Sequence, residues 1–281
     1  MALVLRPMQE KDIPLGMKLK RIAGWNQTEE DWRRLLAYSP EGCFVGEVDG
    51  KPVATGTVCP YGGWFAWVGM ILVLPAYRRR GIGTALIEHA IRLSDSRGLC
   101  AVRLDATPLG KKVYDRLEFT TEYELLRYEG KAPEVTGPSR PMSPEDLLFA
   151  AAFDAPVFGA DRTAMLRLLY RQGGGFCFVE RESSGQLTGY VMARPGERAF
   201  QIGPLVACSP AAAESLLRTV FGVLSGRDVF MDVPLVEPAA RLLAESYGLT
   251  VQRPFIRMYR GTLVDRGRPG LIYATAGPET A

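Results

Sequence analysis

The central elements of the first half meet in the segment Val73-Leu74-Pro75-Ala76-Tyr77-Arg78-Arg79-Arg80-Gly81-Ile82-Gly83-Thr84. A proline ends an apolar, strand-like run, and a basic loop with two glycines leads into a helical pattern. The first N–H groups of a helix have no acceptor within it and lie at the positive end of its dipole. The stretch therefore predicts an anion site that suits a pyrophosphate.

The hydrophobic pattern around this stretch predicts a strand, two helices, three strands, a helix, a strand, a helix and a final strand. Thr28 is the expected N-cap of the second helix, with Asp31 three residues on. The predicted strands span Leu3–Arg6, Cys43–Val48, Val53–Cys59, Phe65–Val73, Ala101–Asp105 and Glu122–Glu129, and the predicted helices span Ile13–Ile22, Glu29–Ala37, Ile82–Ser96 and Lys111–Leu117.

The pattern Arg-x-x-Gly-x-Gly, at residues 78–83, resembles the coenzyme A motif of the GNAT superfamily of N-acetyltransferases. The predicted element order is also similar to that superfamily's order, from Leu5 to Gly130. The resemblance implies acetyl-coenzyme A as co-substrate and direct attack by a primary amine of a small molecule or peptide in a ternary complex. It assigns the cofactor to Ile71, Leu72, Val73, Arg78, Arg79, Arg80, Gly81, Ile82, Gly83 and Thr84.

Within that assignment, the backbone at residues 71–73 faces the pantetheine arm, which adds to the strand as an extra strand would. An N–H group near Leu72 or Val73 becomes the oxyanion donor if the strand bulges there. The alternative interpretation of the whole motif is a helix cap with a solvated arginine cluster. A Rossmann site would need a third glycine after Gly83, and a P-loop would need a Gly-Lys-Ser or Gly-Lys-Thr ending.

The segment Val113-Tyr114-Asp115-Arg116-Leu117-Glu118-Phe119 resembles the GNAT segment whose tyrosine reaches the coenzyme A sulfur. The resemblance makes Tyr114 the general acid, and the alternative is a tyrosine packed on its helix. Because a phenol is a weaker acid than a thiol, a hydrogen bond to the developing thiolate is the expected form of assistance. The chain departs from the family at Thr107-Pro108, where an asparagine is common, and at Glu118, where glycine is usual.

Asp105, at a strand end, is a candidate base, but the second half keeps Asp232 at the matching place, which favours a shared structural role. His89 lies in the middle of the helix after the phosphate loop, where we expect a surface or packing residue. An amine can also lose its proton to water before it binds. The identity of a base therefore stays open.

The stretch from Gly24 to Trp32 places aromatic residues beside carboxylates, at the helices that usually line the acceptor side of a GNAT domain. Trp25 and Glu29 are the candidate substrate residues, because an aromatic ring and a carboxylate suit a cationic amine. The alternative is an ordinary helix start, where acids favour the dipole and Trp25 packs on the turn.

The sequence contains the fold twice. Arg6-Pro7-Met8 recurs as Arg140-Pro141-Met142 and Cys43-Phe44-Val45 as Cys177-Phe178-Val179, both 134 residues later. We expect two tandem GNAT-like domains of the α+β (mixed α/β) class, each a mostly antiparallel twisted sheet flanked by helices. A short linker, Lys131–Ser139, separates a catalytic domain at residues 1–134 from a degenerate domain at residues 135–281.

The second copy lacks the features that carry the chemistry of the first. Residues 207–214, Ala-Cys-Ser-Pro-Ala-Ala-Ala-Glu, replace the phosphate loop without its glycines or arginines, and Ala244 stands opposite Tyr114. One active site per chain is the consequence. This half then buries the first half's sheet or walls the acceptor groove. Residues 262–281 lie beyond the repeat as an extended tail with one apolar piece, Leu271–Ala274.

Composition limits the classes of function. The net charge is +3 and the basic residues are scattered outside residues 78–80, so neither a nucleic acid nor a membrane is an expected partner. Five widely spaced cysteines suit buried free thiols, and no pair has metal-ligand spacing, so no metal is expected. With no signal peptide pattern and no apolar run of membrane-spanning length, we expect a cytoplasmic protein, monomeric or homodimeric.

Two rival functions remain open at this level. A non-catalytic acyl-coenzyme A sensor would keep residues 78–83 but would have no reason to keep Tyr114. A tandem transferase of another acyl group, or of another acceptor, would keep both.

Overall fold

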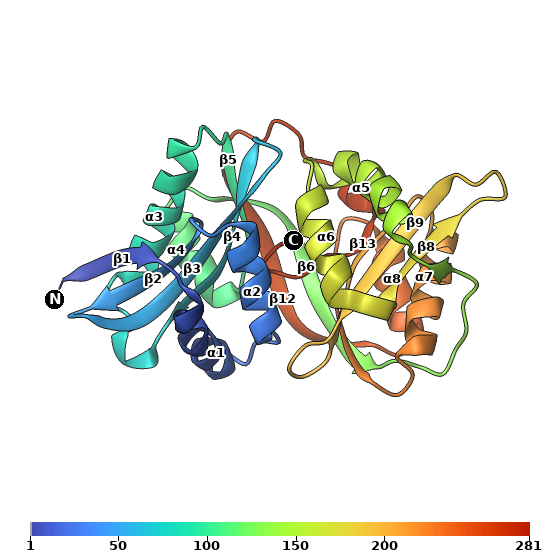
Figure 1. Ribbon diagram of the computed structural model, residues 1–281, viewed down its shortest axis with the longest axis horizontal. Helices are drawn as coiled ribbons and strands as arrows, with labels where there is room; N and C mark the ends of the chain where they lie inside the picture. The colour runs from blue at the N-terminus through green and yellow to red at the C-terminus, as the bar shows by residue number, and fades with distance from the viewer. Residues whose placement is uncertain (1) are drawn as a thin grey trace. The chain divides into compact units, whose positions relative to one another are not determined.

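The computed structural model describes residues 2–281, and its residues form two compact units (Figure 1). The first unit contains residues 2–120, Met258–Val264 and Thr280. The second contains Thr121–Arg257, Asp265–Glu279 and Ala281. The units therefore divide the chain differently from the sequence repeat, because each includes a piece that lies within the other copy.

In the residues of the first copy, the elements follow the order that the hydrophobic pattern predicts. They are β1 (Leu3–Pro7), η1 (Glu10–Asp12), α1 (Ile13–Ile22), α2 (Glu29–Tyr38), β2 (Cys43–Val48), β3 (Lys51–Tyr61), β4 (Phe65–Val73), η2 (Pro75–Tyr77), α3 (Ile82–Ser96), β5 (Ala101–Ala106), α4 (Pro108–Arg116) and β6 (Thr120–Lys131). Strands β1 to β4 pair antiparallel in chain order, and β5 pairs parallel with β4.

Local signals explain the helix boundaries. The Thr28 hydroxyl caps α2 by accepting from the Asp31 N–H at 3.4 Å, and Asp31 Oδ2 accepts from the Thr28 N–H at 2.6 Å, so the predicted capping box is confirmed. Helix α4 begins at Pro108, three residues before the predicted start, because Thr107 caps it and proline suits the first helical position.

The close approach of α1 to α2 requires Gly16, since a Cβ there would lie 2.6 Å from the Trp32 ring.

The residues of the second copy repeat this order. The elements are β7 (Arg140–Pro141), α5 (Pro144–Phe158), α6 (Thr163–Gly173), η3 (Gly174–Phe176), β8 (Cys177–Arg181), β9 (Leu187–Arg194), β10 (Phe200–Ala207), α7 (Pro210–Val223), β11 (Asp228–Pro234), α8 (Pro238–Ser246), β12 (Thr250–Gly261), η4 (Pro269–Leu271) and β13 (Ile272–Ala274). Strands β7 to β10 pair antiparallel in chain order, and β11 pairs parallel with β10. The mostly antiparallel α+β fold, written twice, is confirmed.

The last strand of each copy does not stay with its own copy. Strand β6 pairs antiparallel with β11 in the second unit, from Leu125 opposite Pro234 to Lys131 opposite Asp228. The end of β12 belongs to the first unit, where the Thr262 N–H donates to the Cys100 carbonyl at 2.9 Å. Each unit is therefore completed by residues of the other copy.

Two expectations about exposure and packing are wrong. Cys43, Cys59 and Cys177 are buried free thiols, but Cys100 and Cys208 are exposed. The segment expected as a linker is packed on α7 of the second unit. Its Ser139 N–H donates to the Thr219 hydroxyl at 3.1 Å, and a Cβ on Gly137 would lie 2.4 Å from the Thr219 nitrogen.

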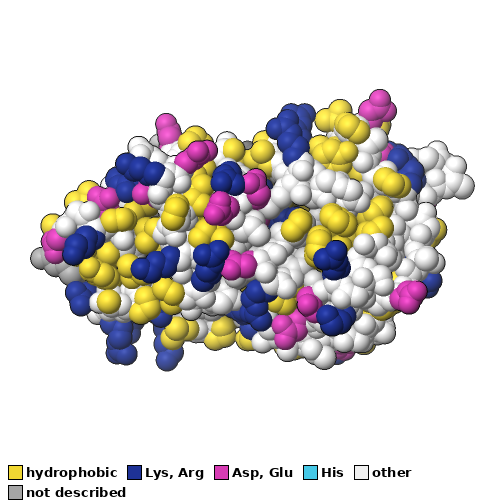
Figure 2. All heavy atoms as spheres, turned by 60° about the horizontal axis from the view of Figure 1, so that its bottom comes forward, with side chains coloured by type: hydrophobic (Ala, Val, Ile, Leu, Met, Phe, Trp, Pro, Cys, Tyr) yellow, Lys and Arg dark blue, Asp and Glu magenta, His cyan; other side chains and the backbone are white. Residues whose placement is uncertain are grey.

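Among residues 2–281, no helix has the length and apolarity needed to cross a membrane, and no group of side chains could hold a metal ion. Figure 2 shows Lys and Arg side chains in separate groups, interspersed with Asp and Glu side chains, over the face that it displays.

Candidate functional site

The N-terminus of α3 leaves its first N–H groups available to a ligand. Gly81 is the N-cap with a φ of 79°, and no side chain caps this helix within the described residues. The first helical bond runs from the Ala85 N–H to the Gly81 carbonyl at 3.0 Å, so the N–H groups of residues 82–84 precede it. A Cβ built on Gly81 or Gly83 would meet no atom within 4 Å. The geometry leaves room for an anion against bare backbone, as a pyrophosphate needs.

The three arginines of the loop are exposed and differ in what they contact. Arg78 braces the loop, because its Nε donates to the Val73 carbonyl at 3.0 Å. The Arg80 guanidinium lies over the Tyr77 ring, 5.4 Å from its centroid. The backbone of Arg79 is in the left-handed conformation, with a φ of 60°. The loop therefore adds positive charge beside a helix end that is already electropositive.

Strands β4 and β5 pair over only a short distance. Phe65–Trp67 face Ala101–Arg103, while among residues 2–281 Leu72 and Val73 pair with β3 alone. The edge of β4 that faces away from β3 is therefore open beyond Trp67, next to the start of the phosphate loop. Of the predicted backbone groups at residues 71–73, the Val73 carbonyl already accepts from Arg78.

The expected bulge is present in β4 and lies slightly earlier than Leu72. Thr55 faces Leu72 and Thr57 faces Gly69. An advance of two residues along β3 therefore corresponds to three residues along β4, which is one extra residue in β4. Met70 has a φ of 52°, and its carbonyl accepts from the Thr55 hydroxyl at 2.9 Å. This hydrogen bond holds the bulge in place in the buried sheet.

Tyr114 lies on α4 and is partly exposed, with its ring edge-on to Phe119 at 5.6 Å. Gly110 lies one turn before it and makes space for the ring, since a Cβ there would be 3.2 Å from Tyr114 Cε2. No hydrogen-bond partner of the Tyr114 hydroxyl is found among the described residues. Burial raises the pKa of Tyr114 to about 12, so the hydroxyl stays protonated at physiological pH and acts as a donor.

The two departures from the family pattern have local explanations. Thr107 caps α4 through its hydroxyl, which accepts from the Gly110 N–H at 3.2 Å, and Pro108 occupies the first helical position. Glu118 has a φ of 62°, a left-handed conformation that glycine adopts without strain. The family's usual glycine is therefore replaced here at a conformational cost.

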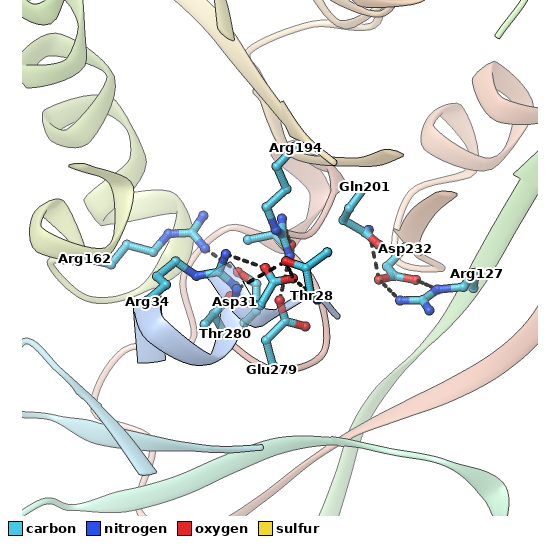
Figure 3. Close-up of polar contacts among 12 residues, drawn as sticks. Thr28, Asp31, Arg34, Arg127, Arg162, Arg194, Gln201, Asp232, Glu279 and Thr280 are labelled. Carbon is cyan, nitrogen blue, oxygen red and sulfur yellow. Dashed lines mark hydrogen bonds and ion pairs between the residues drawn. The ribbon is translucent and has the colours of Figure 1, made fainter. Parts of the chain in front are cut away.

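Asp105 lies near the end of β5 and is partly buried. The matching residue of the second unit, Asp232, is buried and makes a bidentate ion pair with Arg127 at 2.7 and 2.8 Å. Gln201 Nε2 also donates to it at 3.2 Å, and Figure 3 shows Asp232 between these two partners. This arrangement makes Asp232 structural and favours the same interpretation for Asp105.

The two predicted substrate residues lie at the start of α2 but differ in environment. Glu29 is exposed, and its carboxylate pairs with Arg33, four residues on, at 3.0 Å. Trp25 is partly buried, and its backbone N–H donates to the Lys20 carbonyl at 2.9 Å. The third acid of this segment, Asp31, is buried and pairs with Arg34 at 2.6 Å.

Sequence reasoning missed Lys20, whose side chain is fully buried. Its Nζ donates to the Trp25 carbonyl at 3.4 Å, and burial lowers the pKa of the amine to about 8. A sequence signal existed, because Lys20 falls three and seven residues after Met17 and Ile13 on the buried face of α1. Lys20 is therefore hydrogen-bonded to the segment that contains Trp25.

Both halves match known family models. The acetyltransferase (GNAT) family model matches residues 16–119, and an acetyltransferase (GNAT) domain model matches residues 150–274. The chain belongs to the GNAT superfamily. Its two GNAT domains stand in tandem, and the chain is an enzyme of the N-acetyltransferase class.

Two relatives match most of this GNAT chain in sequence. It is 28% identical to holothin acyltransferase of Pseudoalteromonas sp. (strain SANK 73390) over 241 residues, which cover 84% of this chain and 81% of the relative. It is 25% identical to the uncharacterized N-acetyltransferase YitH of Bacillus subtilis (strain 168) over 223 residues, 76% of this chain and 77% of the relative.

Two solved structures share its fold. A putative acetyltransferase from Pyrococcus horikoshii superposes with a TM-score of 0.82 at 23% identity, over 99% of this chain and 96% of that one. A tandem GNAT protein from the clavulanic acid biosynthesis pathway superposes with a TM-score of 0.68 at 15% identity, over 92% and 98% of the two chains.

The second GNAT domain differs from the first at the helix that follows its central strands. Ser209 caps α7 with its own hydroxyl, which accepts from the Ala212 N–H at 3.3 Å, and Pro210 has no N–H to offer. Ala244, which aligns with Tyr114, is fully buried in α8. The helix end that is open to an anion in the first domain is closed in the second.

Proposed function

We propose that the first GNAT domain transfers an acetyl group from acetyl-coenzyme A to a primary amine of a small molecule or peptide, by direct attack in a ternary complex. The observation that carries the proposal is the N-terminus of α3, which has no side-chain cap and where a Cβ on Gly81 or Gly83 would meet no atom within 4 Å. A pyrophosphate suits this helix end by charge, and the two glycines leave room for it beside the backbone.

The bound coenzyme would supply a thioester-activated acetyl group. In this proposal, the N–H groups of Ile82, Gly83 and Thr84 bind its pyrophosphate, and Arg79 and Arg80 add positive charge from the loop. The open edge of β4 at residues 71–73 receives the pantetheine arm as an extra strand. The second unit supports this placement, because a strand of the chain itself adds to the matching edge there.

Three chemical tasks then fall to residues of this domain or to solvent. An N–H group of the Met70 bulge donates to the acetyl oxygen as negative charge develops on it. The Tyr114 hydroxyl, protonated because its pKa is about 12, donates to the departing sulfur. The amine loses one proton to water before it binds, and the proton that its nitrogen releases as the amide forms passes to the departing thiolate or to water. The mechanism therefore requires no dedicated base, and Asp105 keeps a structural role.

A second candidate is transfer of a different acyl group. It is favoured by the similarity to holothin acyltransferase over 84% of this chain, which is named for acyl rather than acetyl transfer. The same residues would perform it, and only the space beside the bulge would differ.

The test is a panel of amines, peptides and aminoglycosides incubated with acetyl-coenzyme A. Turnover is monitored through the release of free thiol, and the affinity for coenzyme A is measured separately. We expect tight binding and turnover on at least one amine. Tight binding with no turnover on any acceptor would instead support a sensor. Repeating the panel with propionyl- and butyryl-coenzyme A separates acetyl transfer from transfer of longer groups.

A further inference from the structure

In the second unit, the tail of the chain fills the place where two central strands part. Strands β10 and β11 pair in parallel only at Phe200–Ile202. Beyond that point β13 adds antiparallel to β10, with Ala274 opposite Leu205 and Ile272 opposite Val206. On its other side, the Thr275 N–H donates to the Asp232 carbonyl at 2.9 Å. The tail therefore hydrogen-bonds to both strands that would otherwise leave an open edge.

This place corresponds to the proposed coenzyme site of the first domain. Leu205, Val206 and Ala207 lie 134 residues after Ile71, Leu72 and Val73, and β10 has a register shift after Ile202, as β4 has after Gly69. Where the first domain leaves its strand edge open, the second domain has a strand of its own chain.

The fit of the tail is close. Ala274 and Ala276 are completely buried, and Ile272 and Tyr273 are nearly so. A Cβ on Gly203 would lie 1.8 Å from the Thr275 carbonyl oxygen, so the tail passes where only a glycine leaves room. A strand that merely lay on the surface would not need this glycine.

A buried arginine holds the residues that follow β13. Arg194 Nη1 donates to the Ala276 carbonyl at 2.6 Å, and its Nη2 pairs with Glu279 at 2.6 Å (Figure 3). Both side chains are at least nine-tenths buried. The contact combines main-chain recognition with a charge-assisted hydrogen bond, as in a peptide-binding groove.

We propose that the groove between β10 and β11 is a peptide site occupied by residues 271–276 of the chain itself, as a built-in substitute for a pantetheine arm. The ligand class is an extended, mostly apolar peptide strand with alanines at its most buried positions. The second domain then takes no coenzyme, and each chain binds a single equivalent. Only the comparison with pantetheine rests on the proposed function, since the peptide site stands on the contacts in the second unit.

The first test uses the unaltered full chain. Hydrogen–deuterium exchange should show the amides of residues 272–275 exchanging at least about a hundredfold more slowly than in a free peptide of residues 268–281. Titration with coenzyme A should saturate at one equivalent. Unprotected tail amides, or two equivalents of coenzyme A, would overturn the proposal. Failure to bind any coenzyme A would contradict the proposed function, while the exchange result would still decide the peptide site.

A second test displaces the tail. Ala274→Asp places a carboxylate at a fully buried position, so the tail should leave the groove and residues 272–275 should lose their protection. The free peptide of residues 268–281 should then bind the variant and not the unaltered chain. The matched control is Val264→Asp, at an exposed tail position, which should bind no peptide. A folded Ala274→Asp chain that ignores the peptide would contradict the proposal, and if that variant does not fold, the exchange measurement on the unaltered chain decides.

Discussion

The Ser209 hydroxyl accepts a hydrogen bond from the Ala212 N–H at 3.3 Å, which closes the N-terminus of α7 with a group from its own chain. The corresponding helix of the first domain begins after Gly81, which has no side chain that could do the same. One chain thus contains the same helix start in a closed and an open form. The pair allows a substitution in one helix to be controlled by the equivalent substitution in the other.

Gly83→Glu should strongly weaken coenzyme A binding and leave the fold intact. Glutamate in the first turn favours the helix dipole, but its side chain enters the open space at Gly83 and repels a pyrophosphate. We expect affinity for coenzyme A to fall by about a hundredfold or more, measured by calorimetry. Ala211→Glu, at the same second position of α7, should leave affinity unchanged. If both substitutions lowered the affinity equally, the proposed anion site at the start of α3 would be contradicted.

Tyr114→Phe should lower turnover by about a hundredfold while coenzyme A affinity stays nearly constant. The pKa of about 12 lies above the ordinary value, so the phenol is protonated and donating at every pH up to about 11. Loss of its proton should therefore cause no fall in rate below that pH in the unaltered enzyme. Tyr247→Phe, in the second unit, serves as the control. Full turnover by Tyr114→Phe would exclude the role.

Glu118→Gly should stabilise the protein by about 0.5–1 kcal/mol, because glycine adopts the φ of 62° without strain. The free energy of unfolding is obtained from urea denaturation. Glu118→Ala keeps the strained conformation and removes only an exposed contact with Arg260 at 3.6 Å, so it should give no gain. A gain from alanine as large as that from glycine would attribute the effect to the lost charge instead.

Lys20 should make stability rise with pH in the alkaline range. Its folded pKa is about 8, below the unfolded value near 10.4, so between these pH values the unfolded chain binds a proton that the folded chain has lost. The free energy of unfolding should rise by about 1 kcal/mol across this window, after allowance for solvent screening. Lys20→Met should lack the rise. Parallel pH profiles for the two proteins would place the amine in a solvated environment.

Because β6 belongs to the second unit and the end of β12 to the first, we expect that neither copy folds alone. Residues 1–134 lack Met258–Val264, which belong to the first unit, and residues 135–281 lack β6, which pairs with β11 in the second. Each fragment should elute as unfolded or aggregated material in size-exclusion chromatography, and coexpression should restore coenzyme A binding. A folded, coenzyme-binding fragment of residues 1–134 would show that the exchange is dispensable.

The elements and their order were predictable from local sequence patterns, and the same patterns predict the anion site at the start of α3. Strand alternation, the Thr28 capping box and the glycines at residues 81 and 83 are local signals, because each acts through hydrogen bonds or packing within a few residues. For the same reason β2, β4, α1 and α3 have the predicted bounds. The loss of glycines and arginines before α7 needed only the internal comparison of the two copies.

Tertiary structure alone decided which strand completes which sheet, where the tail lies and how deeply Lys20 is buried. Strands β6 and β12 have the same pattern of burial along their twelve residues, so each matches either unit equally well in its local pattern. The tail, likewise, looks like any extended apolar segment until the gap between β10 and β11 receives it. Such choices depend on long-range pairing, in which a strand is stabilised by partners about a hundred residues away, and no local pattern records those partners.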